Sequence, residues 1–169
     1  MDELKKIKII DSKNYSKIVK NFSCKAMELD NYLKKKAYID MLDAKSVTYL
    51  LFKDDELFGF YTLNISQVEE DEPNDDGEIE SLNYLELKYL GIDIKYQNKG
   101  IGSTVMKEII ILEVKEYFDF LNLVRGLFII PLNDKARNFY SKFGFETLKF
   151  AAYNGEEIEY LWIDFLPKK

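Results

Sequence analysis

The sequence predicts an α/β (α+β) fold in which one mixed β-sheet carries helices on both faces. Strand-like and helix-like segments follow one another in the order β, α, α, β, β, β, α, β, α, β, β. A largely apolar run, Leu123–Pro131, is typical of a strand in the interior of a sheet. The chain has 169 residues, 47% of them hydrophobic, which suits a single domain over residues 1–169 with one sizeable core.

The first half of the chain predicts a strand, two helices and a β-hairpin. The short run Leu4–Ile10 has the composition of a strand. Over residues 14–42 apolar residues recur at helical spacing with an interruption at Ser23 and Cys24, so two helices are expected. Two β-rich runs then flank Lys53–Asp55, which predicts a hairpin turn.

The second half predicts a long strand, two helices and three further strands. Over Ser81–Tyr96 charged and apolar residues alternate, as in a half-buried strand. The segment Gly102–Phe118 has a broad apolar side and a charged side, which favours a helix. A second helix is predicted with Asn133 as its N-cap and Gly144 as its end. The last strands are expected at Leu123–Pro131, from Phe145 onward and at Glu159–Leu166.

The cysteine and histidine content excludes several kinds of catalytic site. The chain has one cysteine, Cys24, and no histidine. No internal disulfide can form, and a Ser-His-Asp triad, a Cys-His pair or a usual zinc site cannot be assembled, so no metal is expected. No apolar stretch approaches the length of a bilayer span and the N-terminus lacks a signal-peptide pattern, so we expect a cytoplasmic protein with no membrane partner.

Charge is distributed unevenly along the chain, whose formal net charge is -6. The loop-like segment Glu69–Glu80 (residues 69–80) contains eight acidic residues and no basic one. By contrast, Met1–Lys36 contains ten lysines and five acidic residues. The simpler interpretation is a lysine-rich helical surface beside an acidic loop; the alternative is a surface that faces RNA.

Two glycines separate the predicted strand from the predicted helix in YQNKGIGST, Tyr96–Thr104. Gly100 and Gly102 lack a Cβ atom, so a ligand can approach the backbone closely. The start of the helix adds unpaired N–H groups and a partial positive charge, which favour a phosphate or pyrophosphate. The spacing fits neither a Walker A loop nor the dinucleotide fingerprint, which requires a third glycine where Val105 stands.

The pattern Q-x-x-G-x-G over Gln97–Gly102 resembles the acetyl-CoA signature of the GNAT superfamily of N-acetyltransferases. The segment PLNDKARNFYSKFGFE, Pro131–Glu146, resembles the second hallmark of that family, N-x-x-A-x-x-F-Y-x-x-x-G-F. The resemblance covers nearly the whole chain and is strongest over Leu82–Phe145. It implies a GNAT-like, mostly antiparallel sheet, with acetyl-CoA as co-substrate and no metal.

The resemblance also implies which residues bind acetyl-CoA. Its pantetheine arm would pair with the backbone of Ile92 and Ile94, in a gap between the fourth and fifth strands. The loop Gln97–Ser103 would hold the pyrophosphate. The complete set of implied cofactor-binding residues is Ile92, Ile94, Gln97, Asn98, Lys99, Gly100, Ile101, Gly102, Ser103, Asn133, Ala136 and Phe139.

Two side chains are candidates for the chemistry. Direct transfer to an amine expels a thiolate, and the resemblance implies that the Tyr140 hydroxyl, with an ordinary pKa of ~10, donates the proton. Glu86 lies on the strand where many members of the family carry a carboxylate base. The alternatives are that Tyr140 only packs in the core, that Glu86 is only solvated, and that bulk water deprotonates the amine.

One segment points to a particular branch of the family. FSCKAMELDNYLKKKA, Phe22–Ala37, resembles the N-terminal segment of GNAT toxins, F-x-C-G-x-x-x-L-x-x-Y-L-x-x-x-A. Such toxins acetylate the amino group of aminoacyl-tRNA and are covered by a small antitoxin. Lys25 replaces the glycine of that pattern, and Tyr89 stands where the toxins usually have an arginine. Cys24 itself is expected to be a small buried residue that nothing nearby activates.

Three hypotheses about function therefore follow. The first is an acetyl-CoA-dependent N-acetyltransferase that acts by direct transfer on a primary amine of a small molecule or protein. The second is a GNAT-type toxin that acetylates aminoacyl-tRNA, with tRNA and an antitoxin as partners. The third is a non-enzymatic acyl-CoA-binding domain. Dimers are common in the family, so a homodimer is a further expectation, while the residues do not identify the amine acceptor.

Overall fold

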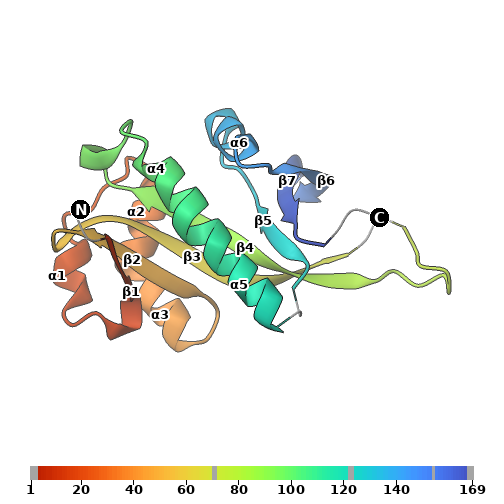
Figure 1. Cartoon of the computed structure of the whole chain (residues 1–169), viewed down its shortest axis with the longest axis horizontal. Coiled ribbons are helices and arrows are strands. Elements are labelled where there is room, and N and C mark those ends of the chain that lie inside the picture. Colours follow the sequence, from red (N-terminus) through yellow and green to blue (C-terminus); the bar gives the residue numbers. More distant parts are fainter. Residues whose placement is uncertain (1–3, 70–71, 122–123, 154, 167–169) are drawn as a thin grey trace. The chain divides into compact units, whose positions relative to one another are not determined.

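The computed structural model describes residues 4–69, 72–121, 124–153 and 155–166 (Figure 1). The chain forms two compact units. The first unit comprises Met1–Asn64 and Leu87–Thr104, and the second comprises Ile65–Glu86 and Val105–Lys169.

Seven strands lie within the described residues and form one sheet in the order β1-β2-β3-β4-β5-β7-β6. Strands β4 and β5 pair in parallel, and the pairs β1–β2, β2–β3, β5–β7 and β6–β7 are antiparallel. The predicted α/β fold with a mixed, mostly antiparallel sheet is therefore confirmed. The strands are β1 (Leu4–Lys8), β2 (Val47–Lys53), β3 (Glu56–Glu69), β4 (Ser81–Ile92), β5 (Gly126–Ile129), β6 (Glu146–Tyr153) and β7 (Glu156–Asp164).

Three short helices of the first unit replace the two that were expected. They are α1 (Tyr15–Val19), α2 (Met27–Lys35) and α3 (Ala37–Leu42). The predicted interruption at Ser23 and Cys24 is confirmed. The additional break falls at Lys36, whose φ of -120° departs from helical geometry between α2 and α3. The core of this unit includes the fully buried residues Ile9, Leu33, Ala37, Leu50 and Phe60.

The predicted hairpin turn between β2 and β3 is confirmed. Asp54 and Asp55 have φ values of 49° and 61°, as the left-handed positions of a two-residue turn require. The turn places Glu56 where its carboxylate accepts hydrogen bonds from Lys95 Nζ at 2.8 Å and from the Tyr96 hydroxyl at 2.7 Å. The hairpin therefore supports the segment that leads into the glycine loop.

The strand predicted over Ser81–Tyr96 ends earlier than expected, at Ile92. Residues Ile94–Tyr96 form a 3₁₀ turn (η2) instead. The Asp93 carboxylate accepts from the Lys95 N–H at 3.0 Å, and such a local side-chain bond competes with the sheet for the backbone.

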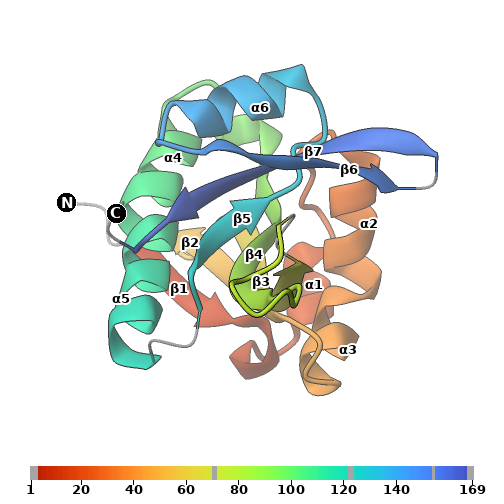
Figure 2. The ribbon, with the colours of Figure 1, turned by 90° about the vertical axis from the view of Figure 1, so that its right-hand side faces the viewer.

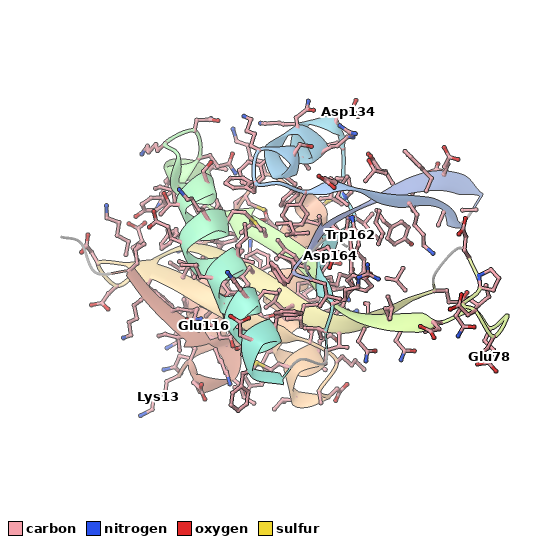
Figure 3. All side chains as sticks on the ribbon, turned by 45° about the vertical axis from the view of Figure 1, so that its right-hand side comes forward. Lys13, Glu78, Glu116, Asp134, Trp162 and Asp164 are labelled. Atoms are coloured by element: carbon pink, nitrogen blue, oxygen red, sulfur yellow. The ribbon has the colours of Figure 1, made fainter. Side chains whose placement is uncertain are left out.

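The acidic loop joins β3 to β4, as expected from its composition. Glu69, the predicted start of the loop, is the last residue of β3. Residues 72–80 are exposed apart from half-buried Asn74, and Glu78 lies among them (Figure 3). Asn74 Oδ1 accepts from the N–H groups of Asp76 at 3.0 Å and Glu78 at 2.9 Å, which gives the loop a defined turn. Glu70 and Asp71 of the predicted loop lie outside the described residues.

The predicted helix after the glycine loop is confirmed. Helical backbone runs from Ile101 to Leu121 as α4 (Ile101–Thr104), a π-helical segment (Val105–Ile110) and α5 (Ile111–Leu121). Most of its apolar side is buried, and Lys107, Glu108, Lys115 and Glu116 are exposed, as the pattern indicated. Leu112, which was expected on the apolar side, is 53% exposed instead. The fully buried residues are Val105, Met106, Ile110 and Val114.

The last helix, α6 (Asp134–Ser141), lies beside β6 and β7 in the second unit (Figure 2). Asn133 Oδ1 accepts from the Ala136 N–H at 2.9 Å, so the predicted N-cap is confirmed. The Arg137 guanidinium donates to the two Glu159 oxygens at 2.7 and 3.1 Å, and this ion pair attaches α6 to β7. Strand β5 lies within the predicted run Leu123–Pro131, of which Leu123 is outside the described residues.

Candidate active site

The glycine loop, residues 97–103, offers a row of unpaired backbone N–H groups. Asn98 and Gly100 have φ values of 59° and 76°, the left-handed conformation that glycine adopts without strain. The N–H groups of Ser103 and Thr104 donate to the Gly100 carbonyl at 3.0 and 3.1 Å and begin the helix. Within the described residues, the N–H groups of 98–102 have no acceptor. Such donors at a helix start suit a pyrophosphate.

Two side chains hold this loop in shape. Gln97 Nε2 donates to the carbonyl oxygens of Ile92 at 2.8 Å and Cys24 at 3.0 Å. Lys99 Nζ donates to the Lys95 carbonyl oxygen at 2.7 Å. The Gln97 side chain is thus occupied by protein acceptors, and the roles of Gln97–Ser103 in binding pyrophosphate stay predictions.

The two isoleucines predicted to pair with pantetheine differ in position. Ile92 is the last residue of β4, whereas Ile94 lies in the η2 turn with its side chain 43% exposed. The Ile94 N–H donates to the Ser23 carbonyl oxygen at 2.9 Å, so it is not free for a ligand. The prediction that Ile94 belongs to the strand is wrong, because the Asp93 turn ends the strand first.

In the second unit, Tyr140 lies in the last turn of α6 with only 7% of its surface exposed. Its ring packs against those of Phe139 and Phe145, with centroids at 5.2 and 5.6 Å. Burial raises the pKa of Tyr140 above its ordinary value. Because its pKa is raised, the hydroxyl keeps its proton at neutral pH. It has no hydrogen-bond partner among the described residues, so this proton can be donated to a ligand.

The hallmark residues around Tyr140 shape its helix. Asn133 and Ala136 form the N-cap hydrogen bond, and the Phe139 ring packs against those of Tyr140 and Phe143, with centroids at 5.2 and 5.0 Å. Helix α6 ends at Ser141, before the predicted end at Gly144, whose φ is 85°. The roles of these three residues in binding acetyl-CoA stay predictions.

Glu86, the candidate base, lies half-buried on β4. One carboxylate oxygen accepts from Ser66 Oγ at 2.9 Å, and the other has no partner in the described part of the chain. The register pairs Glu86 with Phe128 and Phe128 with Trp162, so all three share one face of the sheet, where Figure 3 labels Trp162. The Tyr84 ring meets those of Phe128 and Trp162 at 6.1 and 5.9 Å. The role of Glu86 as a base stays a prediction.

Cys24 is partly buried, and its thiol donates to Asp30 Oδ1 at 3.1 Å. Burial, with a contribution from Asp30, raises the pKa of Cys24 from 9.0 to about 11. The thiol is therefore unreactive at neutral pH, in agreement with the prediction that nothing nearby activates it.

We expect iodoacetamide to alkylate Cys24 at pH 8 about 100-fold more slowly than a free thiol, because a pKa two units higher leaves that much less thiolate. Intact-mass measurement follows the reaction directly, since Cys24 is the one cysteine of the chain. Protein unfolded in denaturant is the control and should react at the free-thiol rate. A native rate equal to the unfolded rate would contradict the contact with Asp30.

Sequence reasoning missed two residues of these sites. Asp93 was placed inside a strand. An aspartate side chain often accepts from the backbone N–H two residues later, as Asp93 does from Lys95, and this bond favours a turn. Ser66 carries no local signal, because only the pairing of two strands brings it to Glu86.

The described residues contain neither a metal-binding cluster nor a membrane-spanning helix. No group of three or more His, Cys, Asp or Glu side chains there could hold a metal ion. No helix in that part of the chain has the length and apolar character of a membrane span.

Comparison with known proteins identifies one family, one relative and several proteins of similar fold. A model of the acetyltransferase (GNAT) family matches residues 15–145. A tRNA-acetylating toxin of Mycobacterium tuberculosis (strain ATCC 25618 / H37Rv) is 31% identical over 134 residues, which cover 76% of this chain and 78% of the toxin. The fold is similar to that of AtaT complexed with acetyl-methionyl-tRNAfMet, with a TM-score of 0.78 and 23% identity over 96% of this chain and 95% of AtaT. It is also similar to AtaTR bound with AcCoA, with a TM-score of 0.72 and 24% identity over 97% and 94% of the two chains.

Proposed function

Because the chain belongs to the acetyltransferase (GNAT) family and is an acetyl-CoA-dependent N-acetyltransferase, we propose that its acceptor is the amino group of an aminoacyl-tRNA. The observation that carries the proposal is the 31% identity to a tRNA-acetylating toxin over most of both chains. This proposal replaces the first hypothesis from the sequence, in which the acceptor was a primary amine of a small molecule or protein. We further propose that both units belong to one catalytic domain, since the family match over residues 15–145 includes parts of each.

The proposed reaction needs one proton donor and one proton acceptor. The neutral amine attacks the thioester carbonyl, the new C–N bond forms and the C–S bond breaks. Tyr140 gives its proton to the departing thiolate, and the amine proton passes to Glu86, directly or through water. The products are N-acetyl-aminoacyl-tRNA and CoA. The buried, protonated hydroxyl of Tyr140 and the free oxygen of Glu86 support these roles.

Lysines of the first unit support an RNA partner. They lie within or next to α1 and α2 along the chain, and Figure 3 labels Lys13 among them. Lysines bind phosphates and release counterions, which makes RNA affinity depend on salt. The exposed members are Lys13, Lys17, Lys20, Lys25, Lys35 and Lys36.

The double variant Lys35→Gln/Lys36→Gln is expected to weaken tRNA binding at low salt. If both lysines contact phosphates, the slope of log affinity against log salt concentration should become shallower by roughly 1 to 2. Filter binding over a salt series measures this slope. The matched control is Lys107→Gln, on an exposed position of the π-helical segment in the second unit. Equal slopes for all three proteins would exclude this part of α2 from the interface.

The proposed acceptor is tested with radiolabelled acetyl-CoA and four separate fractions: charged tRNA, deacylated tRNA, protein and small metabolites. We expect label in charged tRNA alone, its loss in Tyr140→Phe, and growth arrest when the active protein is expressed. Label in protein or metabolites would restore the first hypothesis and disprove the aminoacyl-tRNA proposal. No label in any fraction would support an acyl-CoA-binding domain without turnover.

Further partners follow from the same proposal. AtaT has been solved bound to the C-terminus of the antitoxin AtaR, and we propose that a small antitoxin likewise covers this chain. A homodimer would have twice the 19.9 kDa of one chain, which light scattering would detect. An aminoacyl-tRNA substrate also implies a cytoplasmic protein.

A further inference from the structure

Two aspartates bind the short segment Ser23–Cys24, one from helix α2 and one from the end of β4. Asp30 accepts from the Ser23 hydroxyl at 2.8 Å, the Cys24 N–H at 2.9 Å and the Cys24 thiol at 3.1 Å. Asp93 accepts from the Ser23 N–H at 3.1 Å and the Lys95 N–H at 3.0 Å. The segment therefore connects α2 with the end of β4.

The same segment also contacts the glycine loop. The Ile94 N–H donates to the Ser23 carbonyl oxygen at 2.9 Å, and Gln97 Nε2 donates to the Cys24 carbonyl oxygen at 3.0 Å. We call this set of hydrogen bonds, from Ser23 and Cys24 to Asp30, Asp93, Ile94 and Gln97, the Ser23–Cys24 bridge. It ends at Gln97, the first residue of the loop.

Asp93 is the most deeply buried carboxylate of the bridge, with 5% of its surface exposed. Its own N–H donates to the Phe58 carbonyl oxygen at 2.8 Å, so β3 fixes its backbone. A buried carboxylate is stable only when donors satisfy it, and here two backbone N–H groups, those of Ser23 and Lys95, donate to it. The position of Ser23 and the shape of the turn before the loop therefore depend on one side chain.

We propose that Asp93 is a positioning residue for acetyl-CoA, acting through the Ser23–Cys24 bridge on the glycine loop. Asp93 holds Ser23 against the end of β4, and Ser23 and Cys24 then supply the carbonyl oxygens that orient Ile94 and Gln97. The unpaired N–H groups of residues 98–102 depend on that orientation.

The test is Asp93→Asn, a change that preserves size but removes the charge. An asparagine has one acceptor oxygen and an NH₂ group, so it cannot accept from both Ser23 and Lys95 through separate oxygens. We expect the Kd and the KM for acetyl-CoA to rise about tenfold, as for the loss of a hydrogen bond to a charged group. We expect kcat to change less than about twofold, because the proton donor and acceptor are elsewhere in the chain.

Two controls separate positioning from general destabilisation. Asp43→Asn makes the same chemical change at an exposed carboxylate, which pairs with Lys45 at 2.8 Å. Thr62→Val disrupts the buried Thr48–Thr62 hydrogen bond of 2.9 Å in the same unit and lowers stability away from the loop. Calorimetry with acetyl-CoA alone measures Kd without any acceptor, so this result is separate from the aminoacyl-tRNA proposal.

A Kd for acetyl-CoA in Asp93→Asn equal to that of the wild type would overturn the proposal. The proposal would also be overturned if Asp93→Asn raised the Kd for acetyl-CoA no more than Thr62→Val does when both variants lose the same amount of Tm. If Asp93→Asn does not fold, Gln97→Leu replaces it, because it removes the bonds to Cys24 and Ile92 from a half-buried position. The same tenfold rise is then expected, and an unchanged Kd would reject the bridge.

Discussion

Replacing Tyr140 with phenylalanine is expected to lower kcat for acetyl transfer by about 10²–10⁴-fold, the usual range for loss of a general acid. The ring contacts with Phe139 and Phe145 would remain, since the change removes only the hydroxyl. The Kd for acetyl-CoA and the Tm should therefore stay close to those of the wild type. Steady-state kinetics with calorimetry measure both effects.

The pH dependence gives an independent check on the same hydroxyl. Because burial raises the pKa of Tyr140 above its ordinary ~10, the proton-donating form persists to higher pH than for a free tyrosine. We therefore expect no fall of kcat from Tyr140 ionisation below about pH 10. A matched control is Tyr117→Phe, which removes another hydroxyl of the second unit, one that donates to Glu113 at 2.9 Å. Equal activity of Tyr140→Phe and Tyr117→Phe would reject the acid role.

Gly126→Ala is expected to destabilise the second unit by about 3 kcal/mol, the upper part of the usual range for overpacking. Gly126 pairs with Asp164 across β5 and β7, and an added Cβ would collide with the carbonyl oxygen of Ile163. The obstacle is backbone, so no side chain can move aside. For a chain of this size the expected fall in Tm is roughly 6–12 °C.

A suitable control for that variant is Gly77→Ala in the acidic loop. Gly77 has a φ of 81° with nothing within 4 Å of an added Cβ, so only backbone strain of about 1–2 kcal/mol is expected. Thermal unfolding of both variants beside the wild type decides the comparison. If Gly126→Ala had the Tm of the wild type, the close approach of Gly126 to the Ile163 carbonyl oxygen would be contradicted.

The local features of this protein were determined by the sequence itself. The Asp54–Asp55 turn, the Asn133 cap and the helix after Gly102 depend on residues within four or five positions of one another, so their patterns identify them. The spacing of Gly100 and Gly102 and the motif around Tyr140 likewise indicate the family without reference to tertiary contacts. The family match over residues 15–145 agrees with that reading.

Tertiary structure decided the features that depend on distant residues. Asp93 ends strand β4 through a local bond from the Lys95 N–H, but its second carboxylate oxygen binds the Ser23 N–H, 70 positions earlier, and no local pattern records that partner. Burial raises the pKa of Tyr140 only once the sheet and its helix pack around the ring. Position 126 requires glycine because the backbone of β7 at Ile163 leaves no room for a Cβ atom. Hydrogen bonds and burial between distant segments arise from packing, which a linear pattern of residue types does not encode.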